Sequence, residues 1–305
     1  MRILILHNRY VYSGGEDVVV AAESELLRGY GHEVRVIEAD NRTIGGVLEK
    51  VRTGLQSIYS AAWRRRVEDE IGNFRADVVH VHNFFPLMSP SVYAACKAIG
   101  VPVVQTLHNY RIICPGATLA RDSRVCEECV GKSFAWPAIR HACYRNDRVA
   151  TTATAALFSI HRIAGTWNHD VDAYIALSDF GRRKFVDGGL PAGRIHVKPN
   201  FTTDCGVGDG KGGYFLFAGR LATIKGVRSL LQAYGSGSIT VPLKIVGTGP
   251  LDAEVGEACA ILENIEWLGK REPLEVRGLM RSALAVVCPS EWYEMHPLVV
   301  IEALS

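Results

Sequence analysis

The sequence lacks any long hydrophobic run. None of its apolar stretches approaches the roughly 18 residues that a membrane-spanning helix needs, and the apolar start, Met1–Leu6, is too short for a secretory signal peptide. These absences argue against a transmembrane or secreted protein, and we expect a cytoplasmic location.

The chain also lacks an excess of charge of either sign. Its 34 lysine and arginine residues nearly balance 32 aspartate and glutamate residues, for a net charge of +2, so no nucleic-acid partner is expected. With 48% hydrophobic residues the chain can fill real cores, and its 305 residues suggest about two domains. Nothing in the sequence indicates an oligomeric state.

Strand-like and helix-like segments alternate along the chain, which predicts mostly parallel sheets with helices on both faces. The first series has strands expected at 2–6, 33–37, 77–81, 101–107, 172–177 and 195–197, and helices at 16–30, 47–71 and from 148. The second has strands expected at 214–217, 243–246, 265–268 and 284–288. Residues 202–213 hold five glycines, which is typical of a linker. We therefore predict two doubly wound, Rossmann-like α/β domains, one over 1–200 and one over 214–305, joined by a linker at 201–213.

The last helix is expected to begin near Pro297, a favoured first-turn position for proline. The sequence ends at Ser305, inside that helix, after only four strands of the second sheet. A half-finished sheet would expose an apolar edge, so we expect the C-terminal domain to be truncated. The rival interpretation is a naturally short domain.

Three patterns could bind a phosphorylated ligand. Gly14 and Gly15 follow the first strand, after Ser13, and would let backbone N–H groups approach an anion at a helix N-terminus. The pattern is not G-x-G-x-x-G, so a nicotinamide cofactor is not indicated, and an ordinary tight turn explains it equally well.

The second pattern is a pair of cations after the strand at 214–218. Arg220 offers a fork of donors and Lys225 a point charge, at the strand end where α/β folds bind ligands. The two side chains suit a diphosphate. The alternative is a solvated pair of surface charges.

The third pattern joins Glu294 and Glu302, with seven residues between them. Met295, His296 and Leu298 could offer backbone N–H groups to a phosphate near the start of the last helix. Apolar neighbours indicate that Glu302 is partly buried, and ribose hydroxyls would supply the partners it needs. The alternative is a helix glutamate in a salt bridge.

Together these patterns resemble the retaining glycosyltransferases of the GT-B fold, specifically glycosyltransferase family four. The similar segments, which cover nearly the whole chain, are Asp77–Asn83, Gln105–His108, Ala176–Ser178, Pro199–Asn200, Gly219–Arg220, Lys225–Gly226 and the E-x7-E element from Glu294 to Glu302. The resemblance implies two domains that face a cleft.

The resemblance also implies residue roles. Arg220 and Lys225 would hold the donor diphosphate and stabilise the departing nucleotide. Glu294 would bind the donor sugar, and Glu302 the ribose. The phosphates would approach the backbone at Gly15, beside Gly14, and His108 would lie near the sugar and the acceptor.

The implied reaction is metal-independent transfer of a hexose-type sugar, with retention, from a UDP- or GDP-type donor. Expected acceptors are saccharides or lipid-linked saccharides in polysaccharide or cell-envelope synthesis. One departure is Met295-His296-Pro297, where many members carry Gly-Phe-Gly. The alternatives are a nucleotide-sugar epimerase of similar fold and a non-catalytic binding module.

Eight cysteines are present, and without a secretory signal a disulfide framework is not expected. Cys96, Cys259 and Cys288 lie in apolar or helical contexts, which predicts buried thiols. Cys114, Cys126, Cys129 and Cys143 instead fall in an insertion at about 110–147. Four thiolates could hold one structural zinc; an iron–sulfur cluster or four unlinked thiols are the alternatives.

One segment suggests a membrane contact. The helix expected at 47–71 places Leu55, Ile58 and Tyr59 beside Trp63 and a run of three arginines. Such a helix could lie on the inner face of a plasma membrane as a peripheral contact. A helix packed on the sheet with a solvated basic end is the alternative.

Overall fold

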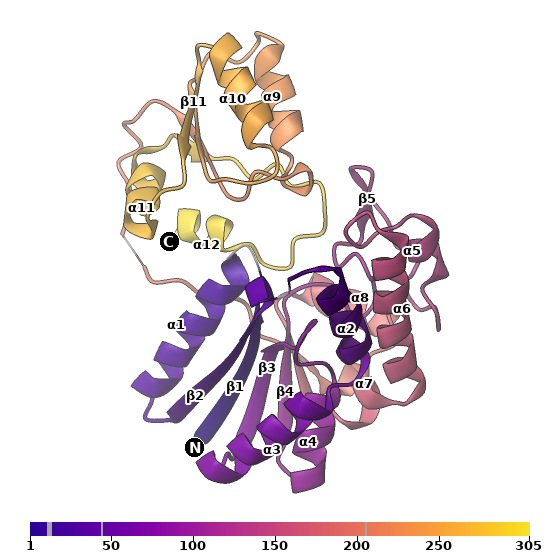
Figure 1. Ribbon diagram of the computed structural model, residues 1–305. Helices are drawn as coiled ribbons and strands as arrows, with labels where there is room; N and C mark the ends of the chain where they lie inside the picture. Colours follow the sequence, from indigo (N-terminus) through magenta and orange to yellow (C-terminus); the bar gives the residue numbers. More distant parts are fainter. Residues whose placement is uncertain (11–13, 44, 205) are drawn as a thin grey trace. The chain divides into compact units, whose positions relative to one another are not determined.

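The computed structural model describes residues 1–10, 14–43, 45–204 and 206–305. The chain divides into two compact units. The first comprises Met1–Leu119 and Glu127–Pro199, and the second comprises Ala120–Cys126 and Asn200–Ser305. Each of the two units has its own large sheet and its own buried core (Figure 1).

The first unit is built on a six-stranded sheet in the order β2-β1-β3-β4-β7-β8, with every neighbouring pair parallel. Its strands are β1 (Arg2–Arg9), β2 (Glu33–Asp40), β3 (Val78–Asn83), β4 (Val103–Leu107), β7 (Ala173–Ala176) and β8 (Ile195–Val197). Leu4, Ile5 and Leu6 of β1 are fully buried. A parallel strand with both faces covered reads as an uninterrupted apolar run, which is why this segment does not alternate.

Helices cover this sheet between its strands (Figure 1). They are α1 (Gly15–Gly29), α2 (Val47–Ile58), α3 (Ala61–Phe74), α4 (Ser91–Ile99), α6 (Arg148–Ile163), α7 (Thr166–His169) and α8 (Asp179–Asp187), with short 3₁₀ turns at Asn41–Thr43 and Ala192–Arg194. The Ser178 hydroxyl accepts from the Gly181 N–H at 3.1 Å and caps α8.

The helical region expected at 47–71 is present, and it is divided into two helices. The first helix, α2, ends before Tyr59, whose backbone is extended. The second helix, α3, begins after Ser60, which is its N-cap. Ser60 is held in turn by the hydroxyls of Ser89 and Ser91. These hydrogen bonds come from a distant part of the chain, so helical periodicity alone could not locate the break.

The insertion contains little regular structure. It has a two-stranded antiparallel hairpin, β5 (Ala120–Arg121) with β6 (Arg124–Val125), and one short helix, α5 (Trp136–Arg140). Of the nine described non-glycine residues with positive φ, seven lie here: Ala117, Leu119, Asp122, Ser123, Ala142, Arg145 and Asn146. A left-handed backbone at non-glycine residues persists only where surrounding contacts fix it.

The second unit contains a parallel sheet in the order β11-β10-β9-β12. Its strands are β9 (Phe215–Ala218), β10 (Leu243–Val246), β11 (Ile265–Gly269) and β12 (Ala285–Val286), and its helices are α9 (Val227–Gly235), α10 (Asp252–Ile261), α11 (Pro273–Ser282) and α12 (Leu298–Leu304). One buried cluster, which includes Phe217 and Ile245, lies on one side of the sheet. A second includes Leu216 and Val246. Successive strand residues alternate between the two clusters, as side chains on a pleated sheet must.

Two further local expectations are corrected. Pro297 is the extended residue before α12, with ψ of 125°, and not its first helical residue. Cys96 is buried as expected, but Cys259 is only half-buried and Cys288 is exposed. Cys288 lies beyond the two-residue strand β12, so the apolar run around it does not continue into the core.

A close backbone crossing fixes the carboxyl end of β10. Gly247 has φ of 132°, and a Cβ there would lie 1.9 Å from the Gly219 carbonyl oxygen. The Gly219 N–H donates to the Val246 carbonyl at 2.9 Å. Only glycine permits this approach between the loops that follow β9 and β10.

Replacing Gly247 by alanine should destabilise the chain by at least about 2 kcal/mol, because a forbidden φ and a backbone clash add. The matched control is Gly278→Ala in exposed α11, where a Cβ meets nothing within 4 Å. That change should stabilise by up to about 1 kcal/mol. Scanning calorimetry of both variants measures the two shifts, and shifts of the same sign would contradict the close crossing.

Candidate functional site

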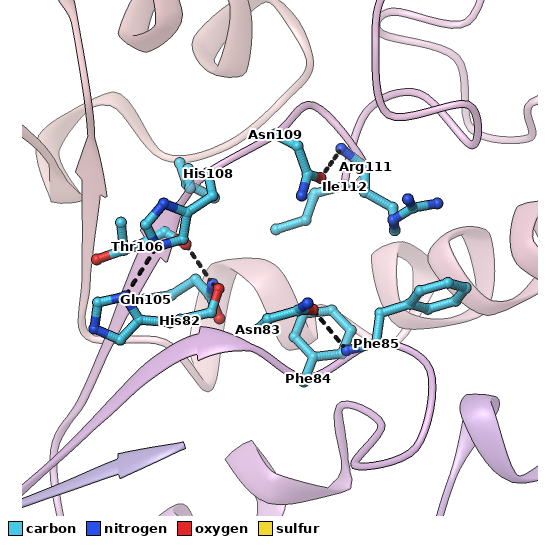
Figure 2. A pocket seen from close by; sticks show the side chains of 11 residues that line it. His82, Asn83, Phe84, Phe85, Gln105, Thr106, His108, Asn109, Arg111 and Ile112 are labelled. Carbon is cyan, nitrogen blue, oxygen red and sulfur yellow. Dashed lines mark hydrogen bonds between the residues drawn. The ribbon is translucent and has the colours of Figure 1, made fainter. Parts of the chain in front are cut away.

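Histidines gather at the carboxyl ends of β3 and β4 in the first unit. His82 and His108 are joined by a hydrogen bond of 2.9 Å between Nδ1 of the first and Nε2 of the second (Figure 2). His80 contacts the His82 ring, with centroids 4.1 Å apart, and its Nε2 lies 2.7 Å from the Thr106 hydroxyl. Adjacent parallel strands end at the same sheet edge, so residues 26 apart in sequence meet here.

These imidazoles are held neutral. Burial lowers the pKa of His80 to about 4 and that of His108 to about 3. Burial also lowers the pKa of His82 far below its ordinary value, and the neighbouring histidines oppose its protonation further. A neutral imidazole offers one N–H and one lone pair, so this group can donate to or accept from a ligand without carrying charge.

A small cavity opens beside these histidines (Figure 2). It is lined by residues 82–85, 105–109, 111 and 112. The Asn83 side chain accepts from the Phe85 N–H at 2.9 Å, and the Asn109 side chain accepts from the Arg111 N–H at 3.0 Å. The structure therefore brings His108 to a concave, polar surface, and sequence reasoning missed Asn109 and Arg111 as part of it.

The start of α1 is occupied by an internal carboxylate. Gly14 and Gly15 are exposed, but the Gly14 N–H donates to the Asp17 carboxylate at 3.0 Å. Asp17 also lies 2.8 Å from His7 Nε2. An anion would thus have to compete with Asp17 for this amide. Ser13 lies outside the described residues.

Glu16 is a buried carboxyl group that sequence reasoning missed. Its pKa is raised to about 8, first by burial and then by the charge of Asp17, while Arg111 opposes the shift. Its Oε1 lies 3.6 Å from His7 Nδ1, and neither atom has a hydrogen-bond partner among the described residues. A proton on this carboxyl group at neutral pH avoids a buried, uncompensated charge.

Glu23, His80 and His82 offer ligand atoms within 4.8 Å of one another. All three already have partners, since His82 Nδ1 is bonded to His108. Lys198 pairs with Glu23 at 3.2 Å, and His80 bonds Thr106. The arrangement is therefore an ion-pair and hydrogen-bond network, in which the Lys198 ammonium already provides the counter-charge of Glu23.

In the second unit, Lys225 and Glu294 meet at the carboxyl end of the sheet. Lys225 Nζ lies 2.5 Å from Glu294 Oε1, and the Ser290 hydroxyl donates to the same oxygen at 2.7 Å. The Glu291 N–H donates to the Ile224 carbonyl at 2.9 Å. Both side chains are partly buried, so a polar group that entered would meet partners already ordered.

The other residues predicted for this site lie in the same unit. Arg220 is exposed just beyond β9, and Glu302 is half-buried on α12. The Met295 side chain is buried, so only its backbone could reach a ligand. The His296 carbonyl accepts from Asn200 at 2.9 Å, and Leu298 begins α12. Trp292 Nε1, missed from the sequence, is buried without a partner among the described residues.

Two of the insertion cysteines border one glycine. Cys114, Cys126, Cys129 and Cys143 form no disulfide. A Cβ on Gly116 would lie 3.8 Å from Cys114 Sγ and 3.5 Å from Cys143 Cβ. Cys129 is buried, and it shares a cavity lining with Cys114.

Comparison with known families agrees with these features. A model described as Glycosyltransferase Family 4 matches residues 13–203, and one described as Glycosyl transferases group 1 matches residues 207–305. The chain belongs to glycosyltransferase family 4. No curated protein sequence matches it. No helix in the described ranges is long and apolar enough to cross a membrane.

Solved glycosyltransferases share the fold. Anabaena Alr3699/HepE in complex with UDP has a TM-score of 0.61 and 16% identity, over 100% of this chain and 78% of that one. WaaG, a glycosyltransferase involved in lipopolysaccharide biosynthesis, has a TM-score of 0.58 and 15% identity over the same shares. The lipopolysaccharide galactosyltransferase WaaB gives 0.56 and 16%, again over 100% and 78%. The predicted GT-B class of α/β fold is confirmed.

The neutral histidines predict a loss of stability as the pH falls below about 6.5. Since the folded chain keeps His80 neutral down to about pH 4, the unfolded chain binds more protons in between. Each such histidine removes up to about 1.4 kcal/mol per pH unit. Glu16 acts in the opposite sense, because it holds a proton in the folded chain up to about pH 8.

Urea titrations at pH 6.5 and 5.5 test this sign. His80→Gln keeps a hydrogen-bonding side chain but cannot titrate, so its stability should depend on pH less steeply, by up to about 1.4 kcal/mol per pH unit. An unchanged slope would show that His80 is not held neutral.

Proposed function

We propose that this glycosyltransferase moves a hexose-type sugar from a nucleotide-diphosphate donor to a saccharide or lipid-linked saccharide. The observation that carries the proposal is the Lys225–Glu294 pair at the carboxyl ends of parallel strands, where α/β folds bind ligands. HepE has been solved with UDP and with UDP-glucose, which makes UDP the first nucleotide to test.

The pair suggests how a donor would be held. A diphosphate would replace the Glu294 carboxylate as the counter-charge of Lys225, with Arg220 as a second cation. Glu294, released from Lys225, would accept hydrogen bonds from sugar hydroxyls, and Glu302 would accept them from the ribose. Backbone N–H groups of Met295, His296 and Leu298 are further candidates for the phosphates.

Transfer would then depend on charge stabilisation by the protein. As the bond between sugar and phosphate breaks, negative charge grows on the departing nucleotide, and Arg220 and Lys225 would stabilise it in place of a catalytic metal. Loss of the leaving group before full attack by the acceptor hydroxyl, on the same face of the sugar, would retain the configuration.

The first unit would serve the acceptor side. Neutral His108 can hydrogen-bond a hydroxyl group without charging it. Gly14 and Gly15 are the predicted backbone approach for the donor phosphates. An acceptor of polysaccharide or cell-envelope synthesis would fit a cytoplasmic enzyme with a peripheral contact at the inner membrane face.

Thermal unfolding with UDP, GDP and ADP tests the donor site. A nucleotide at about a hundred times its Kd should raise the melting temperature by roughly 4 °C. Glu302→Ala should abolish that shift. Glu257→Ala, on an exposed face of α10, is the matched control and should keep it.

Absence of a shift with all three nucleotides would contradict the donor site. A shift that survives in Glu302→Ala would contradict the ribose role of that residue alone. Product analysis with and without acceptor then separates transfer from epimerisation, since only transfer needs an acceptor.

We also propose that Cys114, Cys126, Cys129 and Cys143 hold one structural zinc. The residues between them have little secondary structure and many left-handed backbone positions, which need something to fix them. Cys114 and Cys143 border Gly116, and Cys126 is three residues from Cys129. Four thiolates around zinc would supply the missing constraint.

Metal analysis of the purified chain should find about one zinc per chain. Cys129→Ser should lose most of it and lower the melting temperature. Cys288→Ser, which changes an exposed thiol elsewhere, should keep both zinc and stability. Iron in place of zinc would indicate a cluster, and no metal with four titrating thiols would remove the proposal.

A further inference from the structure

The insertion presents apolar side chains to solvent. Phe134 is 42% exposed, Trp136 is 54% exposed and Val149 is 78% exposed. Their local structure is fixed, because Pro137 and Ala138 of α5 are buried and α5 packs on α6. The buried residues in the middle of α5 therefore anchor this helix, while Trp136 at its start stays exposed.

Basic residues lie close to these apolar residues in the sequence. Residues 129–149 contain Lys132, Arg140, Arg145 and Arg148 but only one acid, Asp147. The four basic residues are exposed, and none of them has an ion pair with another described residue. We call these four residues, together with their sequence neighbours Phe134, Trp136 and Val149, the insertion face.

The single acid does not neutralise this face. The Asp147 carboxylate accepts from the Ala150 N–H at 3.0 Å and caps α6. Residues 129–149 thus carry a net charge of +3, four positive less one negative, in a chain whose total is +2. The remaining residues sum to −1, so the net excess of positive charge falls within this segment, which follows directly on Glu127 and Glu128.

The helix first expected to touch a membrane differs in this respect. On α3, Arg64, Arg65 and Arg66 are followed by three acids at 68–70. Arg64 donates to Glu68 at 2.7 Å, and the Arg66 guanidinium lies over the Trp63 ring. Its charges cancel within the helix, so α3 offers no net attraction to an anionic surface.

We propose that the insertion face docks on an anionic lipid bilayer. The proposal rests on the membrane contact of the proposed function and assigns a surface to it. Binding to the bilayer does not require sugar transfer. Trp and Phe are the side chains that settle at the boundary between headgroups and acyl chains, and arginines around them attract lipid phosphates. An acidic protein could satisfy the charges, but an exposed tryptophan, phenylalanine and valine among exposed basic residues of one short segment favour an interface that accepts both.

Sedimentation of the full chain with vesicles tests the proposal. The chain should bind equimolar phosphatidylcholine and phosphatidylglycerol, bind phosphatidylcholine alone far less, and lose binding as salt is raised. Arg140→Gln with Arg148→Gln should lower the partition coefficient roughly 30-fold, at about 1 kcal/mol per basic residue. Phe134→Ser with Trp136→Ser should weaken it at constant charge.

Arg65→Gln with Arg66→Gln on α3 is the control, with the same two charges removed, and should leave binding unchanged. Trp136→Phe should keep binding but lose the blue shift of tryptophan emission that anionic vesicles cause. Equal partition of the Arg140/Arg148 and Arg65/Arg66 variants, or equal binding to both vesicle types, would overturn the proposal. The nucleotide thermal shift should persist in every variant, so failure to dock is distinguishable from failure of the donor site.

Discussion

The hydrogen bond between His82 and His108 constrains the polar edge of the first unit. Both imidazoles are neutral, so one must donate and the other accept. His82 Nε2 is buried and has no partner among the described residues. If His82 donates through Nδ1, the atom left unpaired is a lone pair. If His108 donates, the unpaired group is a buried N–H, which is the rarer and costlier defect. The first arrangement is therefore favoured, and it leaves His108 with its own proton on Nδ1. The position of that proton decides whether His108 can donate a hydrogen bond to a ligand oxygen. It is set by His82, which need not contact the ligand.

The second unit solves a related problem with opposite charges. Lys225 and Glu294 are brought together by loops whose backbones nearly touch, since a Cβ on Gly226 would lie 1.9 Å from the Pro289 carbonyl oxygen. Each half-buried charge offsets the desolvation cost of the other. A ligand with the same arrangement of charges could take over that role. In a donor that carries both a diphosphate and hydroxyl groups, the diphosphate could pair with Lys225 and the hydroxyl groups could pair with Glu294. The ion pair therefore presents, side by side, the two groups that such a donor would engage.

Sequence reasoning succeeded where a local pattern determines the structure. Apolar runs placed the strands of both sheets. It failed where distant residues decide. The break at Tyr59 depends on hydroxyls of Ser89 and Ser91, which no local periodicity reveals. The Asp17 carboxylate takes the Gly14 amide that looked open to an anion. The raised pKa of Glu16 depends on burial beneath residues far along the chain. The hydrogen-bond partners of buried polar residues depend on the assembled sheet. The sequence can therefore indicate which polar residues belong to a network, but not which residue bonds which.

The insertion links the two proposals that lie outside the sheets. Cys129 and Cys143 bracket the loop that carries Lys132, Phe134, Trp136 and Arg140, while Arg145, Arg148 and Val149 follow directly. A loop that had to order itself on a membrane would lose binding free energy to conformational entropy, at roughly 1–2 kcal/mol per backbone residue fixed. Metal ligation at both ends would order the loop beforehand, so that apolar contact and charge attraction need not offset that loss. A cysteine-held insertion without a hydrophobic core of its own can then keep aromatic side chains exposed, because its fold would depend on the metal and not on burying them.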